Sequence, residues 1–201
     1  MYVSTLRMGG LILAPCLALL LAAPAQAHHL IDISGLAPTP LNGLLSGLAH
    51  PVIGPDHLLF LLALALTGLS QRRTWMLTLL AVGLLGNAAG LIGPGLPGAE
   101  ALVSLSLLIE ALVLLQRLPA GLLVPSMALH GYVLSASVLG WTTMPVASYL
   151  LGLMLCQGAL LLLALWGLQP LASKLQRRGR AVVVALLLGF GMVSLVGQAL
   201  G

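Results

Sequence analysis

The stretch His50-Pro51-Val52-Ile53-Gly54-Pro55-Asp56-His57 decides how this chain is interpreted. It lies within an apolar segment, roughly residues 41–69, that is long enough to cross a bilayer. Two of the five histidines and one of the four acidic residues fall in these eight positions. Only 6% of the chain is charged, so this clustering in an apolar segment needs a physical reason. The hypothesis is a transition-metal site inside a membrane-embedded bundle.

The composition excludes an ordinary soluble domain. The chain is 60% hydrophobic with a mean hydropathy of +1.13, whereas soluble domains are about 25% charged. Runs of about 18 or more apolar residues recur, and the alternation expected of barrel strands is not visible. The sequence therefore predicts an all-α, polytopic membrane protein.

The net charge of +4 does not point to nucleic acid, because the basic residues fall in short loops between apolar segments. We expect a lipid bilayer and no nucleic acid as partners. The two cysteines, Cys16 and Cys156, lie far apart in apolar stretches, which excludes a disulfide framework.

Residues 1–27 have the pattern of a cleaved signal peptide. Arg7 supplies the positive region, residues 11–23 the apolar region, and Ala25-Gln26-Ala27 the small-x-small cleavage site. An uncleaved first transmembrane helix is the competing interpretation. Cleavage would leave residues 28–201 as a single six-helix transmembrane domain.

Six apolar spans follow the signal peptide, and prolines with neighbouring glycines mark the turns between them. The predicted spans are 41–69, 74–93, 98–117, 121–140, 145–168 and 181–200.

The Lys and Arg residues predict the orientation of these spans. All seven basic residues after the signal peptide fall in alternate loops, which the positive-inside rule assigns to the cytoplasm. They are Arg72, Arg73, Arg117, Lys174, Arg177, Arg178 and Arg180. The chain is therefore expected in a bacterial inner membrane with both mature termini outside.

Small residues recur at helical spacing in two spans: Gly83, Gly86, Gly90 and Gly93 in the second, and Gly189, Ser194 and Gly197 in the last. Such spacing lets helices approach closely in lipid. Packing within the chain is the favoured interpretation, and a homo-oligomer through these faces is the alternative.

A few ionisable residues stand inside the spans, where each is costly unless it is paired, hydrated or metal-bound. They are His50, Asp56, His57, Glu100, Glu110 and His130. Each alone could be a hydrogen-bond partner between helices. Together they include carboxylates with no basic residue at similar depth, so a cation from outside would balance the charge.

On a continuous helix His50 and His57 would lie about 10 Å apart, too far to share one ion. Pro51, Gly54 and Pro55 predict a broken helix that draws the two histidines and Asp56 together. A proline kink with histidines bonded to neighbouring helices is the alternative.

Imidazole with carboxylate suits nickel, cobalt, zinc, copper or iron. His28 and His29, at the new amino terminus, would form a chelator that captures metal outside.

The pattern His50-Pro51-x-x-Gly54-x-Asp56-His57 resembles the signature of the HupE/UreJ family of nickel and cobalt permeases. The stretch 43–49, Glu100 with Ser104 or Ser106, and His130-Gly131 also look like that family. One departure is that Cys156-Gln157 stands where relatives often have a histidine.

The resemblance implies a six-helix permease that carries divalent nickel or cobalt inward for hydrogenase or urease maturation. We predict metal ligands at His50, Asp56, His57, Glu100, His130, His28 and His29, with the metal as cargo and no permanent cofactor. No phosphate-binding loop for ATP is present. The rival hypothesis is a zinc-dependent intramembrane hydrolase that uses the same cluster and a serine such as Ser104.

Overall fold

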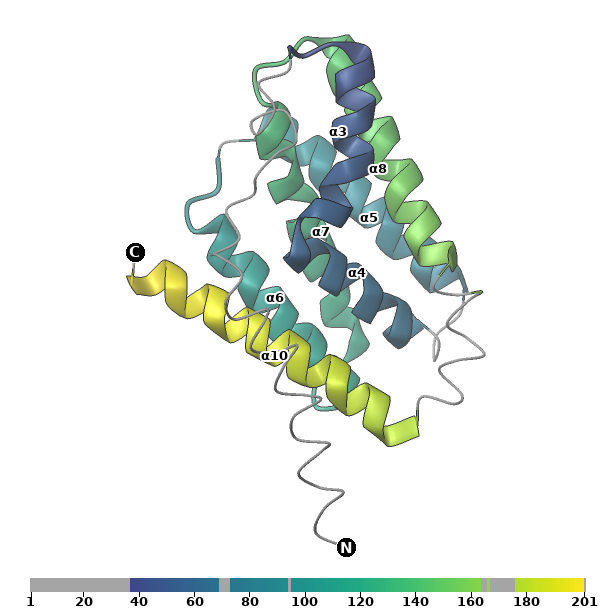
Figure 1. The fold of residues 1–201 in the computed structure, drawn as a ribbon, viewed down its shortest axis with the longest axis vertical. Helices are drawn as coiled ribbons and strands as arrows, with labels where there is room; N and C mark the ends of the chain where they lie inside the picture. Colours follow the sequence, from purple (N-terminus) through teal and green to yellow (C-terminus); the bar gives the residue numbers. More distant parts are fainter. Residues whose placement is uncertain (1–36, 69–72, 94, 164–165, 167–175, 201) are drawn as a thin grey trace, which may run out of the picture.

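The protein is helical throughout the part that the computed structural model describes, which is residues 37–68, 73–93, 95–163, 166 and 176–200 (Figure 1). These residues contain no β-strand, and the predicted all-α class is confirmed. The predicted signal peptide, residues 1–27, lies outside the described residues.

The predicted first span forms two helices, α3 (Pro40–Ile53) and α4 (Pro55–Gly68), which meet at an angle of 73°. α3 begins where the Thr39 side chain accepts a hydrogen bond from the Asn42 N–H, at 3.2 Å. Pro40 suits the first turn, where a missing N–H costs no helical hydrogen bond.

The break falls at Gly54, whose backbone is extended with φ −75° and ψ 107°. The following Pro55 causes this, since its ring disfavours the helical conformation in the residue before it. Pro51, in contrast, lies inside α3 and does not end it. The predicted broken helix is therefore confirmed, and the Gly54-Pro55 pair is responsible for it.

Each of the other predicted spans contains one helix, and short 3-10 turns flank the fourth. The helices are α5 (Arg73–Ile92), α6 (Ala99–Leu114), α7 (Leu123–Leu134) between η1 (Ala120–Leu122) and η2 (Ser135–Val138), α8 (Thr143–Leu163) and α10 (Gln176–Leu200). In the described part, three helices are long and apolar enough to cross a membrane, and the bent pair of α3 and α4 would make a fourth.

α6 and α7 are shorter than their predicted spans, with 16 and 12 residues. α6 stops at Leu114 because Gln116 adopts a left-handed φ of 58°. The Arg117 N–H then bonds Leu112 O at 2.8 Å and the Gln116 N–H bonds Val113 O at 2.9 Å, which closes the helix end in a Schellman motif.

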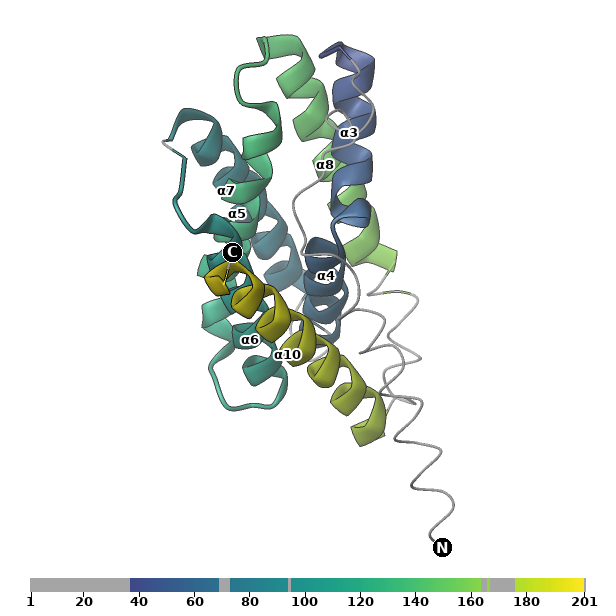
Figure 2. The ribbon, with the colours of Figure 1, turned by 60° about the vertical axis from the view of Figure 1, so that its left-hand side comes forward.

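The helices pack as three close pairs around α4. α3 runs parallel to α8, α5 parallel to α7, and α6 antiparallel to α10. Figures 1 and 2 show α4 between the α3–α8 pair and the α6–α10 pair. Its residues Phe60, Ala63 and Leu64 are completely buried. The bend at Gly54 thus turns the second half of the first span into the centre of the molecule.

Small residues allow the close pairs to form. A Cβ atom on Gly131 of α7 would collide with the backbone carbonyl of Gly83 on α5. The predicted glycine face of α5 therefore packs within the chain, as expected. On α10, Ser194 contacts α6, whereas a Cβ on Gly189 or Gly197 would meet no described atom within 4 Å.

Substituting Gly131 by alanine should destabilise the fold, because the added methyl group meets backbone rather than a movable side chain. We expect a loss of about 1–3 kcal/mol. Gly189→Ala is the matched control: its Cβ has space, and helix propensity should make it neutral or stabilising by up to ~1 kcal/mol. Thermal unfolding in detergent measures both. Equal melting temperatures for the two variants would contradict the packing described.

Candidate metal site

The predicted ligands come from four helices. His50 lies near the end of α3, Asp56 and His57 in the first turn of α4, Glu100 in the first turn of α6, and His130 within α7. All but the half-buried Glu100 are buried. His28 and His29 lie outside the described residues.

The helix break brings His50 and His57 together. Their ring centroids are 5.4 Å apart with the rings edge to face. Two imidazoles that share one ion at a metal–nitrogen distance of about 2.1 Å have centroids roughly 4.5–5.5 Å apart. The distance between the His50 and His57 rings is therefore suitable for binding one shared ion, whereas a straight helix would hold the two rings too far apart.

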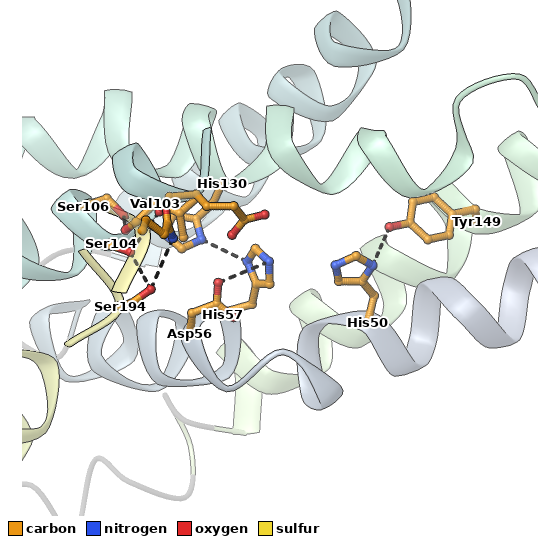
Figure 3. Close-up of polar contacts among 11 residues, drawn as sticks. His50, Asp56, His57, Val103, Ser104, Ser106, His130, Tyr149 and Ser194 are labelled. Carbon is orange, nitrogen blue, oxygen red and sulfur yellow. Dashed lines mark hydrogen bonds and ion pairs between the residues drawn. The ribbon is translucent and has the colours of Figure 1, made fainter. Parts of the chain in front are cut away.

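His130 is fixed by three contacts. Its ring stacks on Phe60 of α4, with centroids 3.9 Å apart. Its Nδ1 lies 3.1 Å from His57 Nδ1, and its Nε2 lies 2.7 Å from Ser106 Oγ (Figure 3). Both ring nitrogens are thus engaged. In this arrangement His130 positions His57, and it could ligate a metal only by giving up one of these hydrogen bonds.

The hydrogen bonds determine which nitrogen carries each proton. Ser106 donates its one proton to Val103 O, at 2.6 Å, so His130 must be the donor through Nε2–H. A neutral His130 then accepts at Nδ1, and His57 donates from Nδ1–H. The lone pair of a neutral His57 therefore lies on Nε2.

That nitrogen faces a carboxylate. His57 Nε2 is 3.7 Å from Asp56 Oδ2, and two lone pairs at this separation repel each other. A cation, either a proton on His57 or a metal ion, removes the repulsion. Glu100, in the first turn of α6, is close enough to interact electrostatically with both Asp56 and His57.

His50 is oriented in a similar way by Tyr149 of α8. The Tyr149 hydroxyl donates to Leu134 O at 2.9 Å and lies 3.0 Å from His50 Nδ1 (Figure 3). With its only proton on the carbonyl, the hydroxyl accepts from His50 Nδ1–H. A neutral His50, like His57, then carries its lone pair on Nε2, the nitrogen that most often ligates metals when Nδ1–H is held by another group.

The gathered side chains do not yet form a complete coordination shell. In the residues that the structure describes, no group of three or more His, Cys, Asp or Glu has the arrangement to hold one metal ion. The ligand set predicted from the sequence remains a prediction, and the structure adds two residues that position its histidines.

Tyr149 and Phe60 were not among the predicted residues. A buried tyrosine in an apolar helix needs a hydrogen-bond partner, and this is the one indication that the sequence offers for Tyr149. Phe60 is indistinguishable in sequence from any other core residue of α4.

The family model described as HupE / UreJ protein matches residues 16–200. The chain belongs to the HupE/UreJ family. This family is associated with nickel and cobalt uptake for hydrogenase and urease maturation, and it is a transporter and accessory family rather than a known enzyme family. Membership and the apolar helices make the chain a membrane protein. No curated protein and no solved structure matches this HupE/UreJ chain.

Substituting Ser106 by alanine should weaken metal binding about 10-fold or more, because His130 loses the partner that fixes its ring and, through it, His57. Ser104→Ala is the matched control, since Ser104 bonds Ser194 of α10, at 2.8 Å, and no histidine. Calorimetric titration of the purified protein with Ni²⁺ measures the affinity. An unchanged dissociation constant in the Ser106 variant would refute its role in positioning His130.

Proposed function

We propose that the protein is a permease that imports divalent nickel, or cobalt, for the maturation of a metalloenzyme. The observation that carries this proposal is the gathering of buried imidazole and carboxylate groups at the helix break: the rings of His50 and His57 have centroids 5.4 Å apart, and His57 Nε2 lies 3.7 Å from Asp56. None of α3, α4, α6, α7 and α8 contains Lys or Arg, so these helices supply no basic residue that could balance the carboxylates. A divalent cation would supply the missing charge.

The proposed route begins at the outer end of the bundle. His28 and His29 would capture the metal, and His50, Asp56 and His57 would bind it with help from Glu100. His130 would then pass the metal inward, after one of its ring nitrogens has given up its hydrogen bond and bound the ion instead. Imidazole and carboxylate ligands favour nickel or cobalt over the softer copper(I). Because the chain has no phosphate-binding loop, transport would be passive, driven by the membrane potential or coupled to a second ion.

The proposed topology has six spans in a bacterial inner membrane, with residues 1–27 as a cleaved signal peptide and both mature termini outside. The antiparallel packing of α6 on α10 supports it, because Arg117 at the end of α6 and Arg180 at the start of α10 then lie at the same end of the bundle. Both side chains are exposed, as expected of groups at a cytoplasmic surface.

A zinc-dependent hydrolase is a weaker proposal. Catalysis needs a fixed ion with three protein ligands and an activated nucleophile or water. Ser104, the serine considered for that role, donates its one proton to Glu100 O and lies 2.8 Å from Ser194 Oγ, so neither of its partners is a histidine. The incomplete ligand shell of the described residues suits a cargo ion that must leave again, as transport requires. We therefore propose that the protein is not an enzyme.

Uptake of radioactive nickel into proteoliposomes tests the permease directly. Wild-type protein should accumulate nickel when the lumen is held negative, and His57→Ala and Asp56→Asn should reduce the initial rate at least about 100-fold, because each removes a ligand. Ser104→Ala should retain uptake. Normal uptake by both site variants would contradict the assignment of the site, and metal that binds to wild-type protein without crossing would favour the hydrolase.

A further inference from the structure

α6 carries a second carboxyl group that the metal site does not use. Glu110 is completely buried, and neither of its oxygens has a hydrogen-bond partner in the part of the chain that the structure describes. It lies ten residues beyond Glu100, which places it about 15 Å deeper along the helix. A buried polar group without a partner is rare in proteins and calls for an explanation.

The position of Glu110 follows from the contacts of its helix. Ser106, one turn earlier on the same face of α6, bonds His130. Leu107 and Ala111, the residues that flank Glu110 on α6 at one turn before it and immediately after it, belong to the apolar core with Phe60 of α4 and Leu187 of α10. Glu110 therefore lies one helical turn, roughly 5.4 Å, beyond Ser106 toward the inner end of α6, beside residues of the apolar core.

The helices packed on α6 bring few charged groups. α4 contributes Asp56 and His57, α7 contributes His130 and Tyr132, and the described basic side chain of α10 is the exposed Arg180. α6 itself adds Glu100 and, just beyond its end, the exposed Arg117. None of the described residues forms a hydrogen bond with Glu110. An ion bound at His57 and Asp56 would add a positive charge on α4, a helix that packs directly on α6.

These surroundings suit a proton better than a metal. A divalent ion needs several oxygen or nitrogen ligands, and one carboxyl group among apolar side chains offers too few. An ionised carboxylate without a partner is strongly disfavoured in such a site, whereas the neutral acid is tolerated. Carboxyl groups inside transporters commonly act in proton relays for this reason.

We propose that Glu110 is a proton-binding site whose proton is released when a divalent cation binds at His57 and Asp56, so that the protein exchanges metal for a proton. The bound cation attracts negative charge, which favours the carboxylate of Glu110, and the O–H bond breaks with the proton passing to water on the outer side. When the metal leaves toward the cytoplasm, the carboxylate of Glu110 takes up a proton from cytoplasmic water. The exchange moves one net positive charge inward in each cycle, so a negative interior still drives it. This inference rests on the proposed metal transport and adds the ion that accompanies it.

Proton release on metal binding tests this proposal without transport. Detergent-solubilised protein is mixed with Ni²⁺ in weakly buffered solution at pH 8, where unperturbed histidines are neutral, and a pH indicator counts the protons. Wild-type protein should release about one proton more per bound ion than Glu110→Gln. For each unit by which the pH is lowered, the nickel affinity of wild-type protein should therefore fall by a factor about ten times larger than the factor for Glu110→Gln. Glu110→Asp, which keeps a carboxyl group, should restore the release.

Gln157→Leu is the matched control, since Gln157 is another buried side chain with an oxygen that has no described partner but cannot titrate. Its proton release should equal that of wild type. Equal release by Glu110→Gln and wild type would overturn the proposal, and circular dichroism spectra of all variants establish that they are folded.

The same variants in proteoliposomes separate this inference from the proposed function. As nickel enters, the lumen of wild-type vesicles should become alkaline, while Glu110→Gln vesicles should show little pH change per ion transported. Nickel uptake by wild type without a pH change would refute Glu110 as an exchange site and leave the permease intact. If wild-type protein takes up no nickel, the permease fails, and proton release in detergent still decides the role of Glu110.

Discussion

The helix break between Gly54 and Pro55 is the constraint on which the rest of the structure depends. A straight first span would carry His50 and His57 on one face about 10 Å apart and leave the centre of the bundle to other helices. The 73° bend instead sends α4 inward, where Phe60 and Leu64 become fully buried. The same bend leaves α3 free to lie along α8, and it puts Asp56 and His57 in the first turn of the central helix. One backbone feature thus sets both the packing and the position of the polar groups.

Hydrogen bonds between different helices hold these polar groups in one orientation. Tyr149 of α8 fixes His50 of α3, and Ser106 of α6 fixes His130 of α7, which in turn fixes His57. Each buried donor would cost about 1–3 kcal/mol if left unpaired, so the bonds tie the helices together as well as the rings. The donors and acceptors in the series from Ser106 through His130 to His57 place the acceptor nitrogen of a neutral His57 at Nε2, 3.7 Å from the Asp56 carboxylate. Stability and the affinity for a cation therefore arise from the same contacts.

Much of this arrangement could be predicted from the sequence, because the deciding rules are local. Pro55 restricts Gly54, apolar runs define helices, and His50 with Asp56 and His57 are neighbours along the chain. The shortness of α6 and α7 could not be predicted, since it depends on a left-handed Gln116 and on 3-10 turns that replace helix at both ends of α7. The roles of Tyr149 and Ser106 depend on helix pairing across 99 and 24 residues of sequence. The engagement of both nitrogens of His130 likewise requires the packed structure, and it means that His130 must give up a hydrogen bond before it can ligate a metal.

X-ray absorption spectroscopy of the nickel-loaded protein tests whether the broken helix holds the metal, because it reports the atoms bound to the ion. The spectrum should show two imidazoles and oxygen ligands, which are His50 and His57 with Asp56 and Glu100. In His57→Ala one imidazole should disappear from the spectrum, while in Ser104→Ala both should remain. A nickel site without imidazole scattering, or one unchanged by the loss of His57, would contradict the role assigned to the broken helix.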